Sequence, residues 1–206
     1  MSSGLEIYLL DVTATQALVG SRNDQLLTVI RENYRADLDR DDDYHRRALA
    51  KGAPTADEAL QAVLFGGPFS ADREHAFQYG YAYHRLCSLT GAFLDNSSFM
   101  PHRGDWLHVV DAGLRKLGIT AVSTSDFEDT DLPAPLPWCY TPMSGTWTHE
   151  QCLRALEQFE ATKQAVDASG QAPPLEPEVV DAVFQCIGWL RHAATRPGSG
   201  IIGFKF

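Results

Sequence analysis

Hydrophobic residues recur mostly at helical spacing along the chain, and two short apolar runs lie near its ends. Residues 5–12 and 201–204 are rich in β-prone side chains, which predicts a strand at each place, and residues 119–122 favour a third, short strand. The last run has no neighbouring strand in sequence, so we expect it to pair with the first. The pattern predicts a helix-rich α+β domain over residues 1–206, whose small sheet pairs the N- and C-terminal strands.

Polar residues that cap helices mark where several of the helices begin. Thr55 and Thr148 each open a capping box, with Glu or Gln three residues later and an apolar periodic segment behind it. Asn23 or Asp24 is expected to cap an earlier helix. Pro177 suits the first turn of the last helix, which is apolar on most faces and should be the most buried.

An acidic run, DLDRDDD, occupies residues 37–43 and invites comparison with a calcium-binding loop. Its first, third and fifth residues are Asp, as in an EF-hand. The sixth place needs Gly and holds Asp42, and the twelfth needs Glu and holds Ala48, so the calcium interpretation is rejected. We interpret the run as acidic residues before a helix over residues 44–50, where the helix dipole favours negative charge.

The most aromatic stretch, DREHAFQYGYAYHRLCSLTG, covers residues 72–91. Its rings alternate as in a strand, but its length, its helix-forming residues and the terminal Gly91 favour a helix. Gly80 costs such a helix about 1 kcal/mol relative to Ala, which suggests that a neighbouring segment approaches closely there. The helix either fills the core or forms the wall of a binding site. The rings concerned are Phe77, Tyr79, Tyr81 and Tyr83.

The second interpretation leads to a set of candidate binding residues. Tyr79 and Tyr81 flank Gly80, where an approaching group would find room, and His75 lies one helical turn before Tyr79. The residues expected to contact a ligand or partner are His75, Tyr79, Tyr81, His84, Asn96, Trp138 and Trp147.

A proline- and aromatic-rich segment connects the two halves of the helical pattern at residues 131–147. It carries Trp138, Tyr140 and Trp147 within a few residues of four prolines. Such a segment is seldom a flexible linker, because large rings gain most when they cover apolar surface. We expect it to fold over the core, and binding to a partner is the alternative.

The charge balance narrows the possible partners. The net charge is −10, with 17 Lys and Arg against 27 Asp and Glu. This disfavours nucleic acids and anionic membrane surfaces and favours basic partners. The start of the chain lacks the pattern of a signal peptide, and no apolar run approaches the length of a membrane span. We therefore expect a cytoplasmic protein that is a monomer or a simple homodimer.

No motif in the chain reaches the specificity of a catalytic or metal-binding signature, so catalytic residues stay unknown and we expect no metal or cofactor. His84 and Cys87 could share a metal, but two ligands do not make a site. His149 begins a HExxH-like sequence, and Leu153 stands where the second histidine is needed. The cysteines lack CxxC spacing, and three fall on apolar helix positions, so we expect free thiols. They are Cys87, Cys139, Cys152 and Cys186.

Several segments together resemble known sequences. EALQAVLFGGPF, YGYAYHRLCSLTG and the ending GIIGFKF, all after about residue 52, are similar to a family of actinobacterial proteins without an assigned activity. More distantly, the chain resembles the YfbM-like bacterial proteins. The resemblance implies a mixed α/β fold with a small sheet, in agreement with the periodicity. It carries over no catalytic residue.

Two classes of function remain. The first is an acidic module that docks a basic protein partner, as immunity proteins and antitoxins do, which the net charge favours by steering such partners. The second is an enzyme or a small-molecule-binding protein with a pocket beside the helix over residues 72–91. From the sequence we prefer the first.

Overall fold

The computed structural model describes residues 2–129 and 132–206, and its contacts gather in two units. The first, called here the sheet unit, comprises residues 1–12, 91–129 and 144–206. The second, the helical unit, comprises residues 13–90 and 130–143. The α+β class and its richness in helix are confirmed. That residues 1–206 form one domain stays a prediction.

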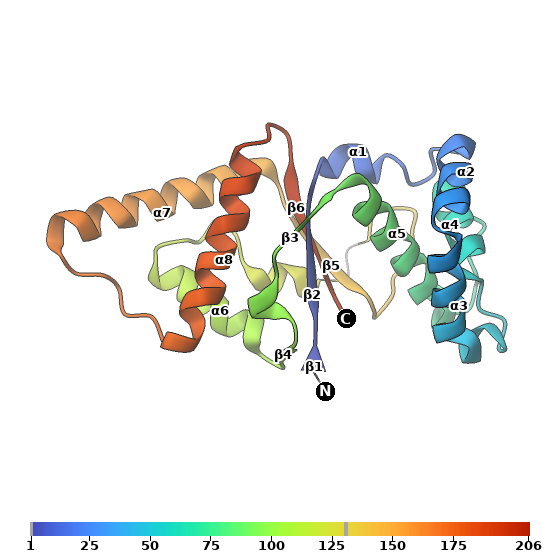
Figure 1. The fold of residues 1–206 in the computed structure, drawn as a ribbon, viewed down its shortest axis with the longest axis horizontal. Helices are drawn as coiled ribbons and strands as arrows, with labels where there is room; N and C mark the ends of the chain where they lie inside the picture. Colours follow the sequence, from blue (N-terminus) through green and yellow to red (C-terminus); the bar gives the residue numbers. More distant parts are fainter. Residues whose placement is uncertain (1, 130–131) are drawn as a thin grey trace. The chain divides into compact units, whose positions relative to one another are not determined.

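The sheet unit is built on the pairing of the two terminal strands (Figure 1). β2 (Leu5–Leu10) runs antiparallel to β6 (Gly200–Lys205), and the register extends from Leu5 opposite Lys205 to Leu10 opposite Gly200. The predicted pairing is therefore confirmed. Side chains on β2 alternate between faces, so Leu5, Ile7 and Leu9 join one apolar core.

Two short strands complete the sheet and were not predicted. β3 (Ala92–Leu94) lies beside β2, and β5 (Met143–Trp147) lies beside β6, which gives the order β3-β2-β6-β5. A separate ribbon pairs β1 (Ser2–Ser3) with β4 (His102–Arg103).

The strand predicted at residues 119–122 is wrong. The backbone N–H groups of Thr120 and Ala121 donate to Gln158 Oε1 at 2.9 and 3.1 Å. A side chain of the following long helix therefore takes the donors that a neighbouring strand would use, and Ile119 is buried without a sheet partner.

Three helices pack with the sheet of this unit, namely α6 (Trp106–Lys116), α7 (His149–Ser169) and α8 (Pro177–Ala194). The capping box at Thr148 and the N-terminal position of Pro177 are confirmed. α7 runs to Ser169, a few residues beyond the predicted end near residue 166, and Gly170 ends it in the left-handed conformation. Figure 1 shows α7 and α8 as the two long helices of this unit.

Large aromatic rings fill the centre of the sheet unit. Trp147 is fully buried, with its ring centroid 4.7 Å from that of Phe127 and 6.2 Å from that of Trp189. Both indoles find a partner, because Trp147 Nε1 donates to the Ser123 carbonyl at 2.9 Å and Trp189 Nε1 to the Asp95 carbonyl at 2.7 Å. The apolar contacts are thus gained without leaving a buried donor unpaired.

In the described residues of the helical unit, a short helix precedes four longer ones (Figure 1). The N-cap at Asn23 and the capping box at Thr55 are confirmed. The helices are α1 (Val12–Gln16), α2 (Asp24–Asn33), α3 (Arg35–Leu49), α4 (Ala56–Phe65) and α5 (Ala76–Thr90), with a 3-10 turn at Arg73–His75 before α5.

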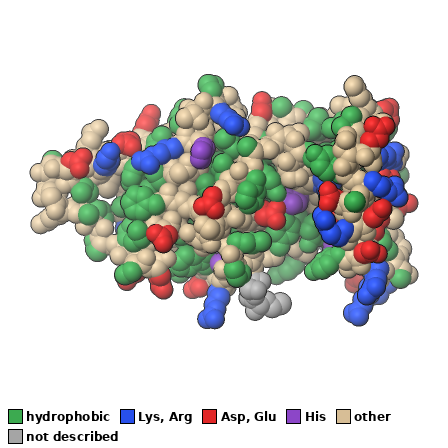
Figure 2. Space-filling view, in the orientation of Figure 1, with side chains coloured by type: hydrophobic (Ala, Val, Ile, Leu, Met, Phe, Trp, Pro, Cys, Tyr) green, Lys and Arg blue, Asp and Glu red, His purple; other side chains and the backbone are tan. Residues whose placement is uncertain are grey.

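The acidic run at residues 37–43 lies inside α3, so the prediction that it precedes a helix over residues 44–50 is wrong. Arg35 pairs with Asp39 at 3.0 Å and Arg40 with Asp37 at 2.5 Å, each within one helical turn. Such pairs at three or four residues stabilise a helix and offset the repulsion among its carboxylates. Blue and red side chains accordingly lie interleaved over α2 to α4 (Figure 2).

The helix predicted over residues 72–91 is confirmed as α5, and so is the close approach at Gly80. A Cβ at Gly80 would lie 2.9 Å from both Cys139 Sγ and Pro142 Cδ. The proline-rich segment therefore packs against α5 within the helical unit.

The expectation that the rings of this segment cover the core is wrong for two of the three. Trp138 is 57% exposed and Tyr140 is 70% exposed, whereas Trp147 is fully buried in β5. The small residues take the inward positions instead, because Cys139 is buried where Gly80 leaves room for it.

No helix within residues 2–129 and 132–206 is long and apolar enough to cross a membrane.

We predict that all four thiols are free and unreactive in the folded protein. All four cysteines are buried, and burial raises the pKa of Cys139 to about 11 and the pKa of Cys87 and Cys152 to about 12. The nucleophilic thiolate is then scarce near neutral pH. Ellman's reagent should react slowly with the native protein and count four thiols after denaturation without reductant. A count of two or fewer would contradict this.

We predict opposite effects on stability from two glycine substitutions in the sheet unit. A Cβ at Gly145 would lie 1.8 Å from the Asp126 carbonyl oxygen, so Gly145→Ala should destabilise the protein by about 1–3 kcal/mol. A Cβ at Gly188 in α8 meets nothing within 4 Å, so Gly188→Ala should stabilise it by about 1 kcal/mol. Urea unfolding of the two variants and the parent measures both. Equal effects would show that the approach at Gly145 is not tight.

Candidate functional site

A pocket of about 230 Å³ opens between α3, α4 and α5 in the helical unit, and we call it the α3–α5 pocket. Its floor is apolar, with Leu38 and Leu60 almost fully buried and Ala82 beside them. These side chains are in place because each lies on the inward face of its helix.

One buried amide belongs to the same pocket. Gln78 is 2% exposed, and its Nε2 donates to the Pro54 carbonyl at 2.9 Å. That bond fixes the orientation of the amide, because the connection between α3 and α4 holds the acceptor. The pocket thus offers a fixed polar group next to an apolar floor.

Aromatic rings form one wall. The His45 ring lies 4.8 Å from the Phe77 ring and 5.2 Å from the Tyr81 ring, measured between centroids. Tyr44 meets His45 edge to face at 4.8 Å and is itself exposed. His45, Tyr44 and Tyr81 all line the pocket. Their spacing is that of favourable aromatic pairs, so the wall is held by its own ring contacts.

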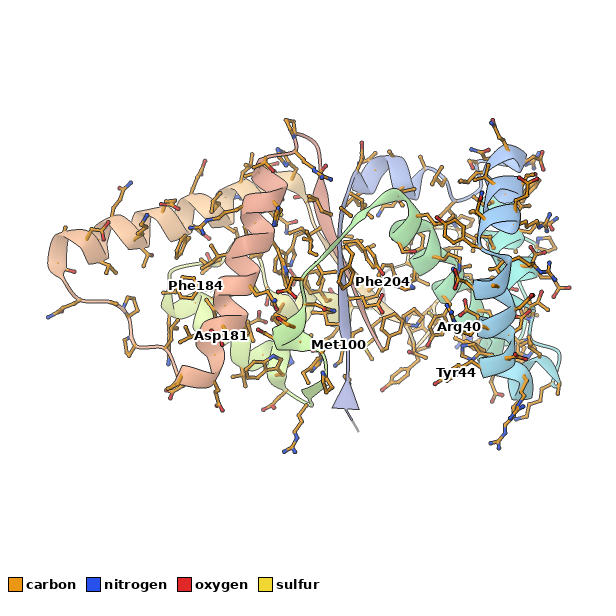
Figure 3. The ribbon with its side chains drawn as sticks, in the orientation of Figure 1. Arg40, Tyr44, Met100, Asp181, Phe184 and Phe204 are labelled. Atoms are coloured by element: carbon orange, nitrogen blue, oxygen red, sulfur yellow. The ribbon has the colours of Figure 1, made fainter. Side chains whose placement is uncertain are left out.

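Charged side chains surround the mouth of the pocket. Arg85 of α5 forms an ion pair with Asp41 of α3, and its side chain is only 17% exposed. Arg40, which pairs with Asp37, extends from α3 together with Tyr44 on the side where α5 lies (Figure 3). The lining therefore combines two guanidinium groups with one carboxylate, that of Asp41.

Burial determines the protonation of the two titratable rings. It lowers the pKa of His45, and the nearby carboxylates of Asp41 and Asp42 oppose this effect only in part. The imidazole is therefore mainly neutral at pH 7. Burial also raises the pKa of Tyr81, against the effect of a hydrogen bond with Thr141, so its hydroxyl keeps its proton. Neither ring adds a charge to the pocket.

Among the residues predicted from sequence, Tyr81 lines this pocket. Tyr79 is buried on the other side of α5, where its hydroxyl accepts a hydrogen bond from Ser70 N–H at 2.7 Å. His75 is buried beside it, with Nδ1 3.0 Å from Ser70 Oγ. His84 is half-buried on α5 and is not among the pocket residues.

The other three predicted residues lie elsewhere. Asn96 and Trp147 belong to the sheet unit, where the Asn96 amide donates to the Leu5 carbonyl and Trp147 lies in the core. Trp138 borders a second hollow of about 300 Å³ in the helical unit, together with Ser70 and Asp72. We prefer the α3–α5 pocket because its lining includes core leucines and a fixed amide.

Ser70, His75 and Asp72 lie together like a Ser–His–Asp triad, but their hydrogen bonds do not fit one. His75 Nε2 is 3.7 Å from Asp72 Oδ2, which exceeds hydrogen-bond length. Asp72 Oδ1 instead accepts from Glu74 N–H at 2.9 Å, and Ser70 Oγ accepts from Asp72 N–H at 3.2 Å. The cluster serves as a cap for the turn before α5, and we assign it no catalytic role.

The α3 side of the pocket was missed from the sequence. Its residues are Leu38, Arg40, Asp41, Tyr44 and His45, which all lie on one continuous helix. The signal was present, since Leu38, Asp41 and His45 recur at spacings of three and four and so share a face. A helix that began only at residue 44, as predicted, would not include Leu38 and Asp41 in this pattern.

In the part of the chain that the structure describes, no group of three His, Cys, Asp or Glu side chains is placed to hold a metal ion.

We predict that His45 titrates below its ordinary pKa of 6.5, because burial disfavours the imidazolium. The contribution of neutral His45 to the folding stability is then present above pH 6.5 and is lost as the pH falls through the lower folded-state pKa. Asp41→Asn should lower the pKa of His45 further, because a carboxylate that favours the charged ring is removed. Asp43→Asn on the exposed side of α3 is the matched control. NMR titration of the His45 ring measures all three, and a midpoint at or above 6.5 would contradict the prediction.

Comparison with known proteins gives one family match. No curated protein and no solved structure matches the chain. The resemblance to actinobacterial and YfbM-like proteins therefore stays a prediction. The model of the family described as "Domain of unknown function (DUF7691)" matches residues 1–205, and the chain accordingly belongs to that family.

Proposed function

We propose that the protein binds a small molecule in the α3–α5 pocket. The observation that carries this proposal is the convergence of three kinds of group in one hollow. They are the buried amide of Gln78, the ring wall that includes His45, and the half-buried ion pair of Arg85 with Asp41. Apolar pockets with a few fixed polar groups are typical of small-molecule sites.

Burial of the charged groups at this site costs folding free energy. Arg85 is largely removed from water, and a buried ion pair regains its desolvation cost only when geometry and further hydrogen bonds are good. An apolar pair of the same volume would often be as stable. Retention of charge next to an apolar pocket is therefore an argument for binding.

Docking of a basic partner, as by an immunity protein, is the second candidate. The net charge of −10 favours it through long-range attraction. The acidic run on α3 adds little support, because Asp37, Asp39 and Asp41 each pair with an arginine of the same chain. We therefore rank the pocket first.

We place this function in the cytoplasm. The four cysteines are free and buried, as expected where thiols stay reduced.

Filling the pocket tests the proposal. Ala56 lines the pocket at the first position of α4, so Ala56→Phe should occupy the space that a ligand needs. Ala36→Phe, on an exposed position of α3 outside the pocket, is the matched control. In a protein-observed NMR screen of one-ring fragments, fragments that perturb the Tyr81 and His45 signals should bind the parent and the control. Their affinity for Ala56→Phe should fall by about tenfold or more, the loss of roughly 1.4 kcal/mol or more of binding free energy.

Two results would contradict the proposal. One is a screen in which no fragment perturbs the signals of Tyr81 or His45. The other is a set of fragments that bind Ala56→Phe as well as the parent, with both variants folded by circular dichroism.

A further inference from the structure

We propose that the ligand of the α3–α5 pocket is a one-ring aromatic or heteroaromatic carboxylate. This inference rests on the proposed function and adds the chemical class of the ligand. It follows from the size of the pocket, the nature of its wall and the charges at its mouth.

The size of the pocket limits the ligand to about one ring. Its volume is about 230 Å³. An apolar cavity of about 150 Å³ holds benzene, so this volume accommodates a six-membered ring with a small substituent. A two-ring or longer molecule would have to extend beyond the mouth.

The wall favours a flat, unsaturated ring. The rings of His45 and Tyr81 lie 5.2 Å apart at a tilt of 48°, and Tyr44 extends the ring surface toward solvent. Because His45 is mainly neutral, its ring can stack against an aromatic ligand without burying a further charge. The floor of Leu38 and Leu60 would contact the opposite part of the ligand.

The guanidinium groups favour an anion. Within the described residues, Arg85 donates one hydrogen bond, from Nη2 to Asp41, which leaves further N–H groups of its fork for a ligand. Arg40 likewise donates from Nη2 to Asp37. Guanidinium groups bind carboxylates through paired, charge-assisted hydrogen bonds, about twice as strong as neutral ones.

A cationic ligand fits the same mouth poorly. An ammonium group that approached Asp41 would also approach Arg85, which is paired with that carboxylate, and the nearby Arg40. Asp41 is instead a positioning residue, because its bond to Arg85 connects α3 with α5 and holds the guanidinium at the mouth. The N–H donors that the two guanidinium groups keep therefore favour a carboxylate over an ammonium group.

Three one-ring probes of similar size test the ligand class directly, namely benzoate, benzamide and benzylamine. They share a ring and differ in the charge of the substituent. By isothermal titration calorimetry at low salt, the parent protein should bind benzoate at least about tenfold more tightly than benzamide, and benzylamine most weakly. Arg85→Met should abolish the preference for benzoate over benzamide. Arg47→Met, an exposed arginine of α3 outside the pocket, should keep it.

The outcomes separate this inference from the proposed function. Equal binding of benzoate and benzamide, or an unchanged preference in Arg85→Met, overturns the carboxylate assignment and leaves a small-molecule pocket. If none of the three probes binds while other one-ring fragments do, the carboxylate assignment is also overturned. If no fragment binds at all, the proposed function itself is contradicted. If Arg85→Met does not fold, Arg40→Met decides, because that side chain is 72% exposed and its loss leaves the core intact.

Discussion

Antiparallel pairing between β2 and β6 is the constraint on which the sheet unit depends, because it joins segments from the two ends of the chain. The register from Leu5 opposite Lys205 to Leu10 opposite Gly200 leaves both outer edges open, and β3 and β5 occupy them. The pairing also sets the packing above the sheet. A Cβ at Gly203 would lie 2.6 Å from the Phe127 ring, so the absence of a side chain on β6 gives that ring its place in the core.

The helical unit depends in a similar way on α5, because different faces of this helix make different contacts. Tyr83 and Leu86 are buried. At Gly80 the missing side chain admits the proline-rich segment, and Tyr81 and Arg85 line the α3–α5 pocket. A helix used on several faces cannot show a simple amphipathic stripe, which explains why its sequence is aromatic and polar throughout.

Charge compensation on α3 links the stability of that helix to the proposed site. Five of the seven residues 37–43 of α3 are aspartates, and their carboxylates would repel one another without counterions. Arg35 and Arg40 supply them from α3 itself, and Arg85 supplies one from α5. The pair that crosses between helices is also the one that brings a guanidinium to the pocket. Asp42 contributes differently, since its side chain accepts a hydrogen bond from the first N–H of α4 at 2.7 Å.

Local features of the sequence determined most of the helices and the two terminal strands, and the pairing of these strands followed because the last one has no neighbouring strand in sequence. Capping boxes at Thr55 and Thr148 and the apolar periodicity act over a few residues, so they can be interpreted without a structure. The α+β class followed from the same signals, and the close approach at Gly80 from the cost of glycine in a helix.

Tertiary structure decided the rest, because the contacts concerned join residues far apart in the chain. β3 and β5 are three and five residues long and exist as strands through their partners in the sheet. Asp41 and Arg85 are separated by 44 residues, and no local pattern brings them together. Of the predicted site residues, Tyr81 alone lines the pocket, because which face of α5 borders a hollow depends on how α3 and α4 pack against it.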